Sequence, residues 1–341
     1  MSTPEAGHER ADQLAARAYE EEQLGRWDPA ARLYALSFRR AVLTGEVEQA
    51  ADSLRGQARV LIQEERFDEA EELVELSREI AERSGLIQSA GRALNVLGII
   101  RFKQRRWEEA RAYYRRALER AIDVGDDDLA GLASQNAGVI AYYLGDLREA
   151  RALYLESIGS FVRSGNSGNA LLTYNNLGLA CVNLRDWLEA DIYYSRGIEI
   201  AERHSKSPLL AKLYGNRAEA LIQIGELDEA VSSLEKAEAA AAAVGDRDAM
   251  ADVFRLRAMI ARLGGDFVTA EGAAGHALEL ATDPSMERAE AWREMAALRV
   301  AQGLTADARE AYRAAGAIYR HLGGDTYAAA TDAEIAALDG V

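Results

Sequence analysis

Proline, cysteine and aromatic residues are all scarce in this chain of 341 residues. With 4 prolines and 7% aromatics, the composition excludes collagen-like and proline-rich disordered classes. The single cysteine, Cys181, cannot form an internal disulfide, so the sequence suits a reducing compartment. The amino terminus lacks the basic start and apolar core of a signal peptide, and no apolar run approaches the roughly 18 residues that a membrane span requires. We therefore expect a cytoplasmic protein without a membrane partner.

Positive charge is also in short supply, because the formal net charge is −16. Such a surface repels the phosphates of nucleic acids unless a local basic patch overrides it. Most arginines alternate with acids, as in "EEARAYYRRALERA" (108–121), which is typical of solvated helical faces. We therefore expect no nucleic-acid partner. The alanine-rich and arginine-rich usage with few lysines indicates a GC-rich bacterial genome.

A short motif that ends in alanine recurs through the chain with a fixed period. "RWDPA" (26–30), "RFDEA" (66–70) and "RWEEA" (106–110) begin a series whose last alanines are 40 residues apart. An eighth copy follows after a step of 38 residues. A period of this length indicates a stacked array of repeats. The repeated alanines are Ala30, Ala70, Ala110, Ala150, Ala190, Ala230, Ala270 and Ala308.

Each repeat is predicted to form two antiparallel helices. Its apolar residues recur every three to four positions, and glycine or a short polar break falls before each motif and again about 20 residues later. A single helix pair cannot bury its apolar face, so stacked neighbours share one core. We expect a disordered segment at 1–7, a repeat array at 8–324, and a capping helix with a tail at 325–341. The predicted repeats cover 8–46, 47–86, 87–126, 127–166, 167–206, 207–246, 247–284 and 285–324.

Small residues recur on the first helix of the repeats, and large residues recur at the start of the second helix. We expect the small residues to let the two helices approach closely, while the large ones fill the space beside each contact. At the helix starts, Asp28 before Pro29 predicts a cap, as do the acids of "GDDD" (125–128). The small residues are Ala58, Gly98, Gly138, Gly178, Ala218 and Ala258, and the large ones are Trp27, Phe67, Trp107, Leu147, Trp187, Leu227 and Phe267.

This pattern resembles the tetratricopeptide-repeat (TPR) family, and the 40-residue period is similar to its long-repeat subclass, which includes the kinesin light chain and bacterial peptide-sensing regulators. The resemblance implies an all-α, right-handed superhelical solenoid of about eight helix-turn-helix repeats plus a C-terminal capping helix. It also implies that the first helices line a concave groove. The residues of 174–201 that carry the family motif are Tyr174, Leu177, Gly178, Trp187, Ala190, Tyr194 and Gly197.

Amide side chains recur in register on the predicted groove wall. An amide both donates and accepts hydrogen bonds, so it can pair with the backbone of a peptide without reading its side chains. The family resemblance implies that equivalent asparagines hold a ligand in this way. The alternative is that the amides bridge neighbouring repeats or are solvated; we favour a peptide-binding groove. One row is Asn136, Asn176 and Asn216, and the row beside it is Asn95, Gln135 and Asn175.

Apolar residues follow the amides along the same helices, which suits a ligand with hydrophobic side chains, either an amphipathic helix or an extended segment. The alternative is that these residues form ordinary core between helices. For Tyr142 and Tyr143, which have polar tips, we favour the groove. The apolar positions are Ile99, Val139 and Leu179, followed by Phe102, Tyr142, Val182 and Ile222.

Four cations lie on predicted groove positions: Arg55, Arg59, Arg92 and Lys103. Arg55 and Arg59 are four residues apart on one helical face, so both could reach one carboxylate or phosphate. This spacing resembles the basic pair of the family's carboxylate clamp, but Val96 replaces the asparagine that completes it. We therefore expect a ligand with acidic residues rather than capture of a terminal carboxylate. The alternative is that the arginines neutralise acids such as Asp52. The far half of the groove is mixed in charge, with Glu219, Asp252, Arg255 and Arg262.

No catalytic or metal-binding pattern is present in the sequence. The histidines His8, His204, His276 and His321 form no pair with metal-ligand spacing. Cys181 lies at a position that a small packed residue usually fills, which indicates a buried, inert thiol. The glycines punctuate turns and form no phosphate-binding loop. We therefore expect no enzymatic activity, no metal and no cofactor.

The predicted function is that of a protein–protein interaction scaffold or adaptor, which binds a peptide or helical segment of a partner in its concave groove. One alternative is a regulatory sensor of a small signalling peptide. Bacterial relatives of that kind usually carry an added DNA-binding or helical-bundle domain, which we do not expect here. A second alternative is a structural subunit that assembles through the ends of the solenoid. The oligomeric state is left open.

Overall fold

The computed structural model describes residues 9–203, 209–282 and 284–338, and every regular element within these ranges is an α-helix. The predicted disordered segment 1–7, His8, His204 and the last residues of the predicted tail (339–341) lie outside the described residues. Among the helices described, none is both long and apolar enough to cross a membrane. The helices are α1 (Ala11–Gln23), α2 (Trp27–Thr44), α3 (Val47–Gln63), α4 (Phe67–Arg83), α5 (Ile87–Lys103), α6 (Trp107–Val124), α7 (Asp127–Tyr143), α8 (Leu147–Ser164), α9 (Ser167–Asn183), α10 (Trp187–Arg203), α11 (Leu210–Ile224), α12 (Leu227–Val244), α13 (Arg247–Leu263), α14 (Phe267–Leu280), α15 (Met286–Ala301), α16 (Thr305–His321) and α17 (Asp325–Ala337).

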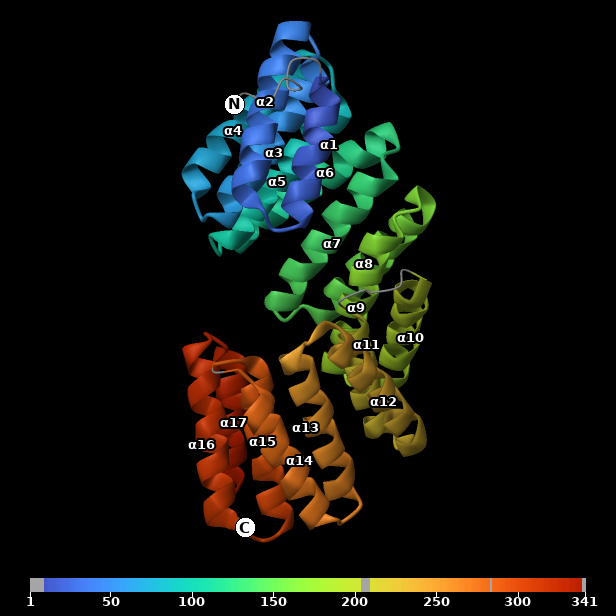
Figure 1. Ribbon diagram of the computed structural model, residues 1–341, viewed down its shortest axis with the longest axis vertical. Helices are drawn as coiled ribbons and strands as arrows, with labels where there is room; N and C mark the ends of the chain where they lie inside the picture. The colour runs from blue at the N-terminus through green and yellow to red at the C-terminus, as the bar shows by residue number, and fades with distance from the viewer. Residues whose placement is uncertain (1–8, 204–208, 283, 339–341) are drawn as a thin grey trace, which may run out of the picture. The chain divides into compact units, whose positions relative to one another are not determined.

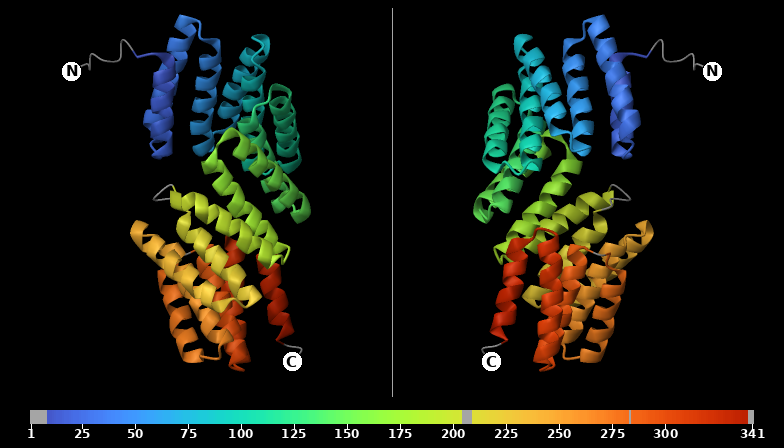
Figure 2. Two further views of the ribbon diagram at one scale, coloured as in Figure 1. Left: turned by 90° about the vertical axis from the view of Figure 1, so that its right-hand side faces the viewer. Right: turned by 90° about the vertical axis from the view of Figure 1, so that its left-hand side faces the viewer.

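Successive helices pair as antiparallel hairpins within each of two compact units, residues 1–176 and 177–341 (Figures 1 and 2). We call the odd-numbered helices from α1 to α15 the A helices, and the even-numbered helices from α2 to α16 the B helices. In the first unit, each A helix also contacts the next A helix, from α1 to α7. In the second unit, α11, α13 and α15 do the same, and α17 packs on α16. The predicted all-α array of helix pairs with an added C-terminal helix is confirmed.

The helix ends follow the sequence signals closely. Every B helix from α2 to α14 begins at a large apolar residue of the predicted series. The cap predicted in "GDDD" is confirmed, because the Asp126 carboxylate accepts a hydrogen bond of 3.1 Å from the Leu129 amide at the start of α7. The cap predicted at Asp28 is wrong, because α2 begins one residue earlier, at Trp27. Asp28 therefore lies inside the first turn, where its charge still favours the positive end of the helix dipole.

Each helix pair is held by a close approach between a small residue on the A helix and a side chain 16 residues later on the B helix. Where the A-helix residue is glycine, the partner is tyrosine, and a Cβ added to the glycine would overlap the tyrosine ring. Where the A-helix residue is alanine, the B-helix residue varies in size, from an aliphatic residue in two pairs to the tyrosine of Ala18–Tyr34 and Ala296–Tyr312. The predicted role of the large residues at the start of the B helices stays a prediction, because the side chains that fill these close approaches lie further along the B helix. The glycine pairs are Gly98–Tyr114, Gly138–Tyr154 and Gly178–Tyr194, and the corresponding alanine pairs are Ala58–Val74 and Ala218–Leu234.

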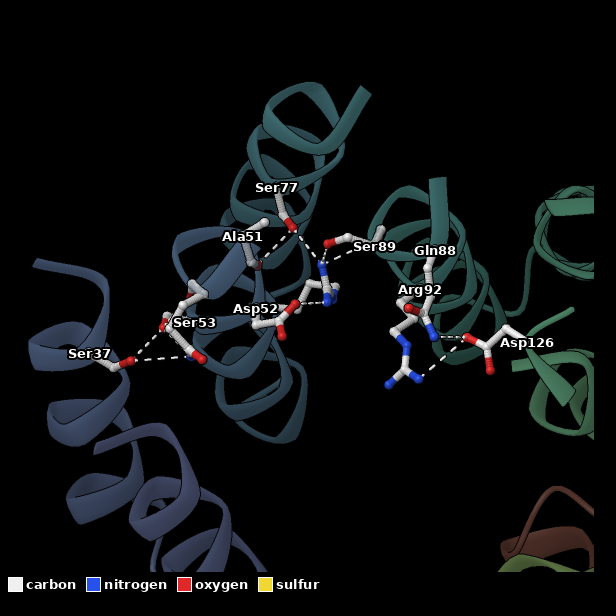
Figure 3. A network of polar contacts seen from close by, with 11 residues as sticks. Ser37, Ala51, Asp52, Ser53, Ser77, Gln88, Ser89, Arg92 and Asp126 are labelled. Carbon is white, nitrogen blue, oxygen red and sulfur yellow. Dashed lines mark hydrogen bonds and ion pairs between the residues drawn. The ribbon is translucent and has the colours of Figure 1, made fainter. Parts of the chain in front are cut away.

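Buried serines add a polar contact to three of these pairs. Ser37, Ser77 and Ser157 on B helices each donate a hydrogen bond of 2.7–2.8 Å to an A-helix carbonyl 26 residues earlier. Ser37 also shares a hydrogen bond of 2.7 Å with Ser53 on the next A helix (Figure 3). A buried hydroxyl requires such partners, so each serine fixes the two helices at the depth where its bond can form.

Three of the turns from an A helix to its B helix carry a charged residue in the left-handed conformation. The φ angles are 60° at Glu65, 59° at Arg105 and 60° at Arg185. Other repeats have glycine at this position, for example Gly145 with φ 84°. Because a Cβ is disfavoured in this conformation by about 1–2 kcal/mol, these three turns retain local strain.

We predict that Gly138→Ala destabilises the protein by about 1–3 kcal/mol, since the new methyl group would lie 2.7 Å from the Tyr154 ring. In a Tyr154→Leu background, which reproduces the Ala218–Leu234 combination, the same substitution should cost less than about 0.5 kcal/mol, because alanine also has the higher helix propensity. The shift of the urea unfolding midpoint, measured in both backgrounds, tests this. An equal loss in both would show that the tyrosine ring does not set the size of the A-helix residue.

Candidate functional site

The structure brings two of the predicted amides into direct contact. The Asn136 side chain on α7 donates a hydrogen bond of 3.1 Å from Nδ2 to Oδ1 of Asn95 on α5. Asn95 is only 7% exposed, whereas Asn136 is half-buried. The pair therefore joins neighbouring A helices across the two predicted rows, with Asn136 on the more accessible side.

The remaining amides lie on the A helices as expected, in different environments. Gln135 on α7 is half-buried, and on α9 Asn175 is 8% exposed while Asn176 is half-buried. All three belong to the first unit. Asn216 is half-buried on α11 in the second unit.

The predicted aromatic residues form a cluster that includes one residue the sequence analysis assigned to the core. Phe102 at the end of α5 and Tyr143 at the end of α7 both contact Trp107, the first residue of α6. Trp107 and Tyr143 are stacked with ring centroids 5.9 Å apart, and Phe102 meets them edge-on at 5.2 and 5.7 Å. Tyr142 packs edge-on against Tyr143, which is 65% exposed. We call Phe102, Trp107, Tyr142 and Tyr143 the aromatic cluster. The signal that could have found it is the recurrence of aromatics at two successive turns of a chain with few of them.

Arg55 is buried inside the first unit and is engaged by its own fold. Its guanidinium donates to the Ser77 hydroxyl at 3.1 Å and to the Ser89 hydroxyl at 2.7 Å, and it forms an ion pair with Asp52. The Ser77, Ser89 and Asp52 side chains converge from α4, α5 and α3 in Figure 3. Burial lowers the pKa of Arg55, while Asp52 opposes this shift. The ion pair agrees with the alternative that this arginine neutralises an acid of the fold.

Arg59 binds a different set of partners from Arg55. The two guanidinium groups therefore do not converge on one position, as binding of a single carboxylate or phosphate by both would require. The Nε and one terminal nitrogen of Arg59 donate to the Glu22 carboxylate of α1 at 2.8 and 2.9 Å. The same terminal nitrogen donates to the Tyr34 hydroxyl of α2 at 2.8 Å. The ring of Tyr34 in turn lies where a Cβ on Gly56 of α3 would be, so Arg59 belongs to the contact between the first two helix pairs.

The other two predicted cations of the first unit are more accessible. Arg92 contacts Asp126 at 3.4 Å, and Gln88 donates to the same carboxylate at 2.7 Å (Figure 3). Although burial opposes the shift, the Leu129 amide and these two side chains hold the pKa of Asp126 below its usual range. Lys103 is exposed and forms no ion pair with any described residue. Arg55 is buried and Arg59, although 35% exposed, is bonded to Glu22 and Tyr34, so Arg92 and Lys103 are the predicted cations best placed to meet a ligand.

In the second unit, the predicted mixed charges neutralise one another. Arg255 of α13 bonds Asp252 at 2.7 Å and Glu219 of α11 at 3.0 Å, and Arg262 bonds Glu294 of α15 at 2.6 Å. Although Arg255 opposes the shift, burial together with Asp252 and a further nearby carboxylate raises the pKa of Glu219. These ion pairs connect successive A helices.

Residues suited to hold a metal do not gather in the part of the chain that is described, where no group of three or more His, Cys, Asp or Glu side chains is placed for one. Cys181 is buried on α9, with its sulfur 3.8 Å from a carboxylate oxygen of Glu189. His276 packs edge-on against Phe254 with ring centroids 5.4 Å apart. The groups that remain for recognition are the amides, the aromatic cluster and the accessible cations.

We predict that Arg55→Met destabilises the protein by about 2–3 kcal/mol, because hydrogen bonds of a buried cation are lost and buried serines lose a partner. Arg92→Met is the matched control and should change stability by less than about 0.5 kcal/mol, since its side chain is exposed and its contact is long. Chemical denaturation of both variants measures the difference. Equal stability of the two variants would contradict the structural role of Arg55 and return it to the candidate site.

Residues 89–161 and 169–243 match a family model described as tetratricopeptide repeat. No curated protein matches the chain in sequence. Among solved structures, the apo form of the quorum sensor NprR from B. thuringiensis is similar at 13% identity with a TM-score of 0.59, over 96% of this chain and 97% of that one. A Rap protein in complex with Competence and Sporulation Factor is similar at 14% identity with a TM-score of 0.52, over 97% and 93%.

A signal transduction ATPase with a tetratricopeptide repeat sensor, from Pyrococcus horikoshii, matches at 16% identity with a TM-score of 0.66, over 94% of this chain and 50% of that one. Identities this low establish a shared fold and nothing about shared ligands. The fold, the repeat register and the matching family model agree with one another. The chain therefore contains tetratricopeptide repeats over residues 89–161 and 169–243.

Proposed function

We propose that this protein is an interaction scaffold that binds a peptide segment of a partner along its A helices. The observation that carries the proposal is the Asn95–Asn136 pair in register with further amides on neighbouring A helices. The bond between the two asparagines uses one donor and one acceptor site, whereas each amide offers two donors and a carbonyl with two lone pairs. Asn136, half-buried, has capacity left to pair with a peptide backbone.

The ligand is proposed to be recognised mainly through its backbone. Gln135 and Asn176 in the first unit and Asn216 in the second offer the same chemistry at half-buried positions. Since Arg55 and Arg59 are held by the fold, a preference for acidic ligands depends instead on Arg92 and Lys103. The cytoplasmic location, the bacterial source and any assembly through the ends of the array stay predictions.

A second candidate is a sensor of a signalling peptide. It is favoured by the similarity in fold to a Rap protein in complex with Competence and Sporulation Factor and to the quorum sensor NprR. A sensor differs from a scaffold in one measurable respect: its ligand changes its affinity for a further partner. The scaffold is the primary proposal because it requires only that the amides bind a peptide, whereas a sensor also requires a further partner.

The triple substitution Asn136→Ala, Asn176→Ala and Asn216→Ala is expected to weaken partner binding by about tenfold or more. Each lost hydrogen bond contributes about 0.5–1.5 kcal/mol, and about 1.4 kcal/mol corresponds to a factor of ten. The measurement is a pull-down from lysate of the source organism, followed by affinity measurement on the identified partner. Circular dichroism first establishes that the variant is folded.

The control replaces an exposed amide on an A helix that carries none of the register amides, Gln23→Ala on α1, and should bind as the wild type does. If the folded triple variant retains every partner of the wild type, the amides serve only the fold, and the proposed site is rejected.

A further inference from the structure

The aromatic cluster and the Asn95–Asn136 pair share one face of the same two helices. Phe102 follows Asn95 by seven residues on α5, and Tyr143 follows Asn136 by seven residues on α7. Seven residues complete nearly two helical turns, so the rings lie on the face of the amides and about 10 Å further along the helix axis. An extended peptide covers this distance in about three residues. One ligand can therefore reach both features.

The aromatic cluster is built as a rigid surface. Trp107 and Tyr143 stack within 6° of parallel, and Phe102 supports both rings from the edge. Rings that are already fixed by their neighbours lose little conformational freedom when a ligand binds. Tyr143 is nevertheless 65% exposed. A large exposed aromatic surface on a rigid support is typical of the positions that dominate binding between proteins.

The turn from α5 to α6, which is one of the two turns that carry the cluster, is locally basic in a chain that is otherwise acidic. The segment "RFKQRR" (101–106) contains four cations and no acid. Arg101 pairs with Glu71 and Glu109, and Arg106 pairs with Glu109, whereas Lys103 and Arg105 form no ion pair among the described residues. In the two turns that carry the cluster, the exposed charges without an ion pair among those residues are Lys103, Arg105, Arg148, Glu108 and Asp146.

Arg105 is also retained in the strained conformation that its counterpart Gly145 relieves. Glu65 and Arg185 have the same conformation at the corresponding turns, so the conformation itself does not single out Arg105.

We propose that the bound segment carries a large apolar or aromatic side chain about three residues from the backbone held by Asn95 and Asn136, with a carboxylate next to it. The apolar side chain packs on Tyr143 and Trp107, and the carboxylate reaches Lys103 or Arg105. This inference rests on the proposed peptide-binding function and adds the ligand's chemistry: an anchor with an acidic neighbour. A segment of this kind complements the rings and the local positive charge together.

The test is selection of a random 12-residue peptide library displayed on phage against the full chain, with counter-selection against Tyr143→Asn. Asparagine is the residue at the corresponding position of the next repeat, Asn183, so this variant is compatible with the turn. Peptides that depend on Tyr143 should contain an aromatic or large aliphatic residue beside an aspartate or glutamate. Absence of Tyr143-dependent peptides, or enrichment of peptides with basic neighbours, overturns the inference.

Affinities of the selected peptides then separate the two contacts. Tyr143→Asn should weaken binding by about tenfold, as expected for loss of a central aromatic contact. Arg105→Gly, which reproduces Gly145, should weaken binding by about threefold and reduce its dependence on salt. Arg185→Gly makes the same backbone change in the second unit and should leave binding unchanged. Equal effects of Arg105→Gly and Arg185→Gly would overturn the role of the Arg105 charge.

Peptides selected on the wild-type chain without the counter-selection distinguish failure of this inference from failure of the proposed function. If the triple variant of Asn136, Asn176 and Asn216 weakens binding of a peptide and Tyr143→Asn does not, the proposed role of the amides is kept and the proposed apolar contact at Tyr143 is overturned. Peptides affected by neither variant would overturn both. Peptides weakened by each variant separately are the expected result.

Discussion

The close approach of the two helices in each pair is the constraint on which the rest of the structure depends. A glycine on the A helix leaves room for a tyrosine ring from the B helix, as at Gly138 and Tyr154. This contact fixes how deeply the helices interlock, so it also fixes which side of each A helix remains uncovered. The uncovered side carries the amides and ends in the aromatic cluster. Recognition therefore uses what close packing leaves accessible.

Polar side chains connect one helix pair to the next, and some of them are also the candidate ligand contacts. Arg55 joins α3 to α4 and α5, and Asn136 joins α7 to α5. A group that holds two helices together can still bind a ligand only if it has unused donors or acceptors. Asn136 meets that condition, because an amide has more hydrogen-bonding sites than its one bond consumes. Arg55 does not, because it is buried among three partners.

The fold was predictable from the sequence because its determinants are local or periodic. The recurring alanines and the A-helix glycines repeat every 40 residues, and their size alone indicates close helix contact. The site was less predictable because its contacts depend on which of several neighbouring groups a long side chain binds in the folded protein. Arg59 is four residues from Arg55 yet pairs with Glu22, which is 37 residues away in the sequence. Trp107 occupies a repeating core position, and only the structure shows it stacked against Tyr143.

The Gly–Tyr contact lies inside one 40-residue repeat, which has a consequence for how such a chain changes length. Unequal recombination that deletes residues 127–166 would remove one complete helix pair and leave the internal contacts of every other pair intact. Asn176 would then take the place of Asn136 beside Asn95, so an amide pair would persist at the new junction. Asn183 would take the place of Tyr143, and the stacked ring would be gone. Loss of one repeat would thus keep an amide pair that can bind a peptide backbone but remove the ring that contacts the ligand's apolar side chain. A change in the number of repeats could therefore alter which ligands bind without any point mutation.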